Sequence, residues 1–111
     1  MTRPVLAVDW DGTLVDTPTQ EWLPGAQDAL RALLKSGYTI LIHTCRANYT
    51  AGLKMVEEKL VDGGFEGWLL SGDMQVWQGK GKPDAAVYID NLALSFECWA
   101  DLVPEIRRRL R

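Results

Sequence analysis

The chain has 111 residues and a mass of 12.4 kDa, which is enough for one domain with its own core and too little for two. Hydrophobic residues make up 47% and charged residues 24% of the sequence, as in an ordinary soluble globular protein. The net charge of −3 argues against broad electrostatic binding to nucleic acid or to an anionic membrane, and no apolar run reaches the roughly 20 residues that span a bilayer.

The sequence alternates segments typical of strands with segments typical of helices. The first helix is expected between Pro24-Gly25 and Ser36-Gly37, because Ala26, Ala29, Leu30, Leu33 and Leu34 mark one apolar helical face. Asp101 is a plausible N-cap for the last helix. The other expected helices are residues 50–62 and 101–110, and the expected strands are residues 4–8, 38–43, 68–70 and 85–89.

This alternation predicts a single α/β domain over residues 1–111 with a mainly parallel sheet and right-handed crossovers. Ligands of such open sheets bind beyond the carboxyl ends of the strands. Residues 72–84 form the one long irregular stretch, which is often functional in a small domain.

The apolar run at residues 5–8 ends in two carboxylates, Asp9 and Asp11. In extended backbone, side chains two residues apart point to the same side, so we expect these carboxylates to stand together. They repel each other unless a cation or proton lies between them, which suits Mg²⁺. His43 is the single histidine, so a multi-histidine metal site is excluded and any metal ligands are oxygens.

Cys45 and Cys98 do not make a disulfide framework or a zinc-type cluster. No secretion signal is visible at the N-terminus, so we expect reduced thiols and a cytoplasmic protein. Cys45 is expected to be a buried, inert thiol.

Polar residues also stand at the ends of the second and fourth expected strands. Thr44 follows the second strand, Asp90 follows the fourth, and Lys82 lies in the preceding loop. Together with Asp9 and Asp11 they would converge on one crevice. A carboxylate nucleophile, a second carboxylate as proton donor and cationic groups that neutralise phosphate oxygens are the parts that phosphoryl transfer needs.

These segments, in this order, resemble the four motifs of the haloacid dehalogenase (HAD) superfamily. The resemblance rests on Asp9-Trp10-Asp11-Gly12-Thr13-Leu14, Thr44, Lys82 and Tyr88-Ile89-Asp90-Asn91, and it is closest to the small capless members found in bacteria and phages. It implies a three-layer Rossmann-like core without a cap domain.

The resemblance also implies a Mg²⁺-dependent phosphatase that acts through an aspartyl-phosphate. Asp9 would be the nucleophile and Asp11 the general acid and base. Thr44 and Lys82 would bind the substrate phosphate, and Asp90 would complete the Mg²⁺ site with Asp9 and the backbone carbonyl of Asp11.

Two features depart from the family pattern. Asn91 stands where members often carry a second acidic residue, which removes charge from the metal site. The chain leaves no room for a cap domain after Asp11 or after Thr44, so the active site should be open. An open site favours a large substrate, or an oligomer or partner that acts as a lid.

Several residues also have plainer interpretations. Thr44 can simply cap the next turn, and Arg46 can grip a substrate phosphate or pair with a surface carboxylate. Lys80 competes with Lys82 for the phosphate. His43 is expected to pack at the end of the sheet.

The aromatic residues and the glycine turn also have alternatives. Trp10 and Trp77 are candidate substrate platforms, whereas most of the five tryptophans should lie in the core. Asp9-Trp10-Asp11-Gly12 could be a mere turn, and an EF-hand calcium loop is excluded because Gln20 stands where a bidentate Glu belongs.

Three functions compete. The leading one is hydrolysis of a phosphate monoester, carried either by a small molecule or by a nucleic-acid end. The alternative is a binding or regulatory module with the same fold and weak catalysis. A phospho-receiver domain is disfavoured, because no aspartate ends the second or third expected strand.

Overall fold

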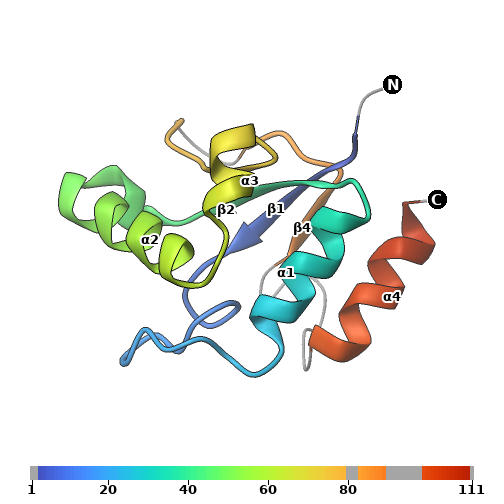
Figure 1. The fold of residues 1–111 in the computed structure, drawn as a ribbon, viewed down its shortest axis with the longest axis horizontal. Helices are drawn as coiled ribbons and strands as arrows, with labels where there is room; N and C mark the ends of the chain where they lie inside the picture. The colour runs from blue at the N-terminus through green and yellow to red at the C-terminus, as the bar shows by residue number, and fades with distance from the viewer. Residues whose placement is uncertain (1–2, 80–82, 90–98, 111) are drawn as a thin grey trace.

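The computed structural model describes residues 3–79, 83–89 and 99–110, and for residues 99–102 and 109 it describes the backbone only. Figure 1 shows the path of the chain. The described strands form one four-stranded sheet in the order β3-β2-β1-β4, and every pairing is parallel. The strands are β1 (Val5–Asp9), β2 (Thr39–His43), β3 (Met74–Val76) and β4 (Val87–Ile89).

Among the described residues, four α-helices and one 3₁₀ helix connect and flank these strands. Because β1-β2 and β2-β3 step across the sheet in the same direction, right-handed crossovers place their connecting helices on one face. Figure 1 shows the last helix beside the first, so it lies with that same layer. The helices are α1 (Ala26–Lys35), η1 (Cys45–Asn48), α2 (Thr50–Asp62), α3 (Glu66–Ser71) and α4 (Trp99–Arg109).

The core lies between this helical layer and one face of the sheet. Ile42 and its register partners Val8 and Val76 point into it, whereas Leu41 and its partner Gln75 point to the opposite face. Ile42 and Val8 are fully buried, but Leu41 is half-buried and Gln75 is exposed. The described residues therefore form two layers, and the second helical layer of the expected three-layer core is not among them.

The predicted α/β class and the parallel sheet are confirmed. Residues 50–62 form α2 as expected, and the predicted apolar face of α1 is the face that it buries. β1, β2 and β4 lie within one or two residues of their expected positions.

The third expected strand is wrong. Residues 68–70 belong to α3, which ends at Gly72 in a left-handed conformation with φ of 85°. The actual third strand, Met74–Val76, lies inside the segment predicted to be irregular. A short apolar run has no period that separates a strand from a helix, and this is the reason for the error.

The last helix begins earlier than expected. Its start at Trp99 places Asp101 inside the first turn, so Asp101 is not its N-cap. Within the described ranges, no helix is long and apolar enough to cross a membrane.

The two faces of β2 can be compared by mutation. Ile42→Ala should lower the free energy of unfolding by about 2–5 kcal/mol, because it leaves a cavity in the core. Leu41→Ala, one residue away on the half-open face, should cost clearly less because its side chain already contacts water. Urea unfolding of both variants measures the difference, and equal losses would contradict a one-sided core.

Candidate active site

The candidate site begins where β1 ends. Asp9 is the last residue of β1, and Asp11 stands two residues beyond it in a tight turn. The carbonyl of Trp10 accepts hydrogen bonds from the amides of Leu14 and Val15, and Gly12 has a φ of 77° that favours glycine. The turn therefore directs the two aspartates to different partners instead of continuing the strand.

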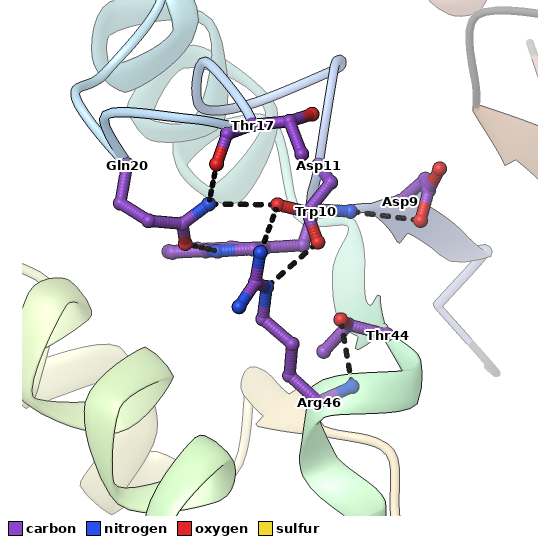
Figure 2. Close-up of polar contacts among 7 residues, drawn as sticks. All are labelled: Asp9, Trp10, Asp11, Thr17, Gln20, Thr44 and Arg46. Atoms are coloured by element: carbon purple, nitrogen blue, oxygen red, sulfur yellow. Dashed lines mark hydrogen bonds and ion pairs between the residues drawn. The ribbon is translucent and has the colours of Figure 1, made fainter.

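Asp9 lies in register with His43 of β2, and both side chains are half-buried. One carboxylate oxygen of Asp9 accepts a hydrogen bond of 3.0 Å from the backbone amide of Trp10. Figure 2 shows the Asp9 carboxylate on one side of that amide and the Asp11 carboxylate turned toward Arg46 and Gln20.

Asp11 and Arg46 form a two-pronged ion pair although they are far apart in sequence. Arg46 donates from Nε to Oδ2 over 2.8 Å and from Nη2 to Oδ1 over 3.0 Å. The side chains are 28% and 35% exposed, so the pair is partly shielded from water. Of the two alternatives for Arg46, the structure therefore realises the pairing with a carboxylate, and this carboxylate belongs to the site.

The environment of Asp11 favours its ionised form. Partial burial acts to raise the pKa of Asp11, but the hydrogen bonds from Arg46 and Gln20 and the charge of Arg46 outweigh it and hold the pKa below its usual value. The hydrogen bond to Asp11 likewise raises the pKa of Arg46, against partial desolvation. At neutral pH both groups are charged.

Gln20 is the residue that sequence reasoning missed. Its amide Nε2 donates to Asp11 Oδ1 over 2.7 Å and to the carbonyl of Thr17 over 2.9 Å, and its Oε1 accepts from the indole Nε1 of Trp10 over 2.9 Å. Its φ of 58° is in the left-handed region, which is uncommon for a residue other than glycine. This fixed amide ties Asp11 to the core.

Trp10 is not a substrate platform. It is fully buried, and its ring meets that of Trp22 edge to face with centroids 5.5 Å apart. It anchors the turn after β1, because its indole N–H is bonded to Gln20. Trp77 is half-buried, and its backbone amide bonds to the carbonyl of Ile42.

Thr44 follows β2 and is buried, with 8% of its surface exposed. Its extended backbone and side-chain oxygen cap η1, and that oxygen accepts from the amide of Arg46 over 3.2 Å. The capping interpretation is confirmed. This bond uses the hydroxyl as an acceptor, so its O–H remains able to donate to an anion. Cys45, expected to be buried, is exposed.

The remaining predicted residues, Lys80, Lys82, Asp90 and Asn91, lie outside the described residues, so their roles stay predictions. Among the described residues, no group of three or more His, Cys, Asp or Glu side chains could hold a metal ion. The expected Mg²⁺ site includes Asp90, and it therefore stays a prediction as well.

Comparisons with known proteins bear on the fold alone. No family model matches the sequence, and no curated protein matches it. A solved structure of a conserved protein coded by a locus of Bacteroides thetaiotaomicron is similar, with a TM-score of 0.77 and 21% identity, over 97% of this chain and 93% of that one.

The ion pair predicts a dependence of stability on pH. Arg46→Met should lower the free energy of unfolding by up to about 1 kcal/mol at pH 7. The pKa of Asp11 is lower in the folded state than in the unfolded state, where it is about 3.9. The contribution of the pair is therefore fully present above the unfolded-state pKa and is lost as the pH falls through the folded-state pKa. Urea unfolding between pH 2 and pH 7 measures it.

The control is Lys54→Met. Lys54 lies 3.9 Å from Glu58 in an exposed ion pair, so removing its charge should have little effect at any pH. A loss in Arg46→Met that stays constant across this range would contradict the assigned pairing.

The amide of Gln20 can be tested by an isosteric change. Gln20→Glu replaces the donor to Asp11 with a carboxylate and should cost about 1–3 kcal/mol at pH 7. The cost should shrink at acidic pH, because repulsion raises the pKa of the introduced carboxyl and its protonated form can donate again. Gln78→Glu adds the same charge at an exposed position and should be neutral. Equal stability of the two variants would remove Gln20 from the site.

Proposed function

We propose that this protein is a Mg²⁺-dependent phosphomonoester hydrolase built on a HAD-type core, with an aspartyl-phosphate on Asp9. The observation that carries the proposal is the pairing of Asp11 with Arg46 across two strand ends: Asp9 ends β1 and Asp11 follows it, and Thr44 and Arg46 follow β2. The similar solved structure supports the fold alone, and the order of the motifs supports the activity.

In this proposal, a carboxylate oxygen of Asp9 attacks the phosphorus and the bond to the leaving oxygen breaks. Asp11 takes up a proton from solvent when the substrate binds, gives that proton to the leaving oxygen, and later takes one from the water that hydrolyses the aspartyl-phosphate. Thr44 donates its O–H to a phosphate oxygen. The cycle returns Asp9 to its starting state and releases inorganic phosphate.

Arg46 is a candidate ligand of the substrate phosphate as well as the partner of Asp11. It makes two hydrogen bonds to Asp11, and a phosphate group offers the same two-pronged acceptor. In the proposed mechanism, the substrate phosphate takes Arg46 from Asp11. Asp11 then loses Arg46, one of the two donors that lower its pKa, and lies beside new negative charge, so its pKa rises toward that of a proton donor.

The oxygen donors near β1 suit Mg²⁺. The Asp9 carboxylate and the backbone carbonyl of Asp11 would hold the ion, with Asp90 from outside the described residues. When bound, the ion would neutralise charge on the transferring phosphoryl group. The substrate is a phosphorylated small molecule or a nucleic-acid end, and a large substrate, a partner or a second copy would cover the open site.

One observation favours the alternative, a binding or regulatory module with weak catalysis. Asp11 is held by Arg46 and by Gln20, and Gln20 is itself fixed to the buried Trp10. If this network persists when phosphate is present, Asp11 stays ionised and cannot donate a proton.

Hydrolysis of an aryl phosphate with and without Mg²⁺ tests the proposal. Asp9→Asn should reduce Mg²⁺-dependent turnover by at least about a thousandfold, because the amide cannot form the intermediate. Asp28→Asn makes the same change at a side chain that is 91% exposed on α1 and should keep full activity. Undiminished turnover in Asp9→Asn would refute the role of Asp9. Phosphate binding without hydrolysis in the unaltered protein would favour the binding module.

A further inference from the structure

The position of Arg46 depends on how η1 meets α2. Tyr49 lies between η1 and α2 as the C-cap of the first and the N-cap of the second, and its backbone amide bonds to the carbonyl of Arg46 over 3.2 Å. The first turn of α2 thus packs directly on the backbone of Arg46. Gly52 is the half-buried third residue of that turn.

Gly52 has no room for a side chain. A β-carbon there would overlap the carbonyl oxygen of Arg46 and would lie 3.0 Å from its carbonyl carbon and 3.2 Å from its Cα. The atoms in the way are backbone atoms, which cannot rotate aside as a flexible side chain can. The φ of Gly52 is outside the left-handed region, so close approach, and not an unusual backbone conformation, requires glycine here.

We propose that Gly52 is a positioning residue for Arg46: its missing side chain lets α2 lie against η1, which sets the guanidinium at bonding distance from Asp11. A two-pronged pair is sensitive to such placement, because both N–H groups must reach their oxygens at once. Displacing η1 to admit a methyl group would break at least one of these bonds. The inference about substrate binding rests on the proposed function, but the inference about the ion pair does not.

Gly52→Ala tests the proposal, with Gly67→Ala as the matched control. Both changes add one methyl group to a helical glycine, but a β-carbon at Gly67 would meet nothing within 4 Å. The first measurement is the NMR signal of the Arg46 Nε–H. It should move in Gly52→Ala toward its position in Asp11→Asn, and it should stay in place in Gly67→Ala.

A double-mutant cycle gives a second readout. Arg46→Met should lower the urea midpoint in the unaltered protein and in Gly67→Ala, and this loss should disappear in Gly52→Ala, because the pair is already broken. An unmoved Nε–H signal with the full effect of Arg46→Met in Gly52→Ala would overturn the proposal. Loss of cooperative unfolding in Gly52→Ala would overturn it too, since Gly52 would then hold the fold and not Arg46.

The functional arm measures the KM and kcat of aryl phosphate hydrolysis. Gly52→Ala should raise KM about tenfold or more, and adding Arg46→Met should raise it no further. A changed Nε–H signal with an unchanged KM would refute the link to substrate binding while leaving the ion-pair role intact. If neither the unaltered protein nor any variant hydrolyses the substrate, the proposed function fails. The NMR signal and the stability cycle still decide the role of Gly52.

Discussion

The in-register parallel pairing of β1 with β2 is the constraint on which the site depends. The pairing runs over five residue pairs and ends with Asp9 opposite His43, so both strands stop at the same level of the sheet. Asp11 follows one strand by two residues, and Arg46 follows the other by three. A one-residue shift of register would turn the buried face of β2 outward and carry Arg46 away from Asp11, so core packing and site geometry are fixed together.

Much of this arrangement follows from the sequence, because apolar runs that end in polar residues report strand ends directly. Asp9 and Thr44 lie at the ends of β1 and β2, where the pattern places them, and the amphipathic period of α1 identifies its buried face. The third strand could not be identified in the same way. Met74 and Val76 are buried on either side of exposed Gln75, a three-residue alternation that is too short to separate from a loop by sequence alone.

Contacts between loops were beyond sequence reasoning for a different reason. The pair of Asp11 with Arg46 requires the exact path of η1, and the role of Gln20 requires a left-handed backbone for which glutamine has no local preference. No pattern marks Gln20, because its three hydrogen bonds go to residues that a turn brings near it. The exposure of Cys45 has the same origin, since it depends on the direction in which η1 leaves the sheet.

Charge balance sets what the proposed reaction still requires. Asp9 and Asp11 contribute two negative charges, and Arg46 contributes one positive charge to Asp11. A phosphate monoester adds between about one and a half and two negative charges at pH 7. Moving Arg46 from Asp11 to the phosphate redistributes its charge without adding any, so the reaction needs further cations. Mg²⁺ and Lys82, the two groups predicted from the motifs, would supply that charge. Under the proposed function, phosphate binding would therefore depend on the metal as much as on Arg46.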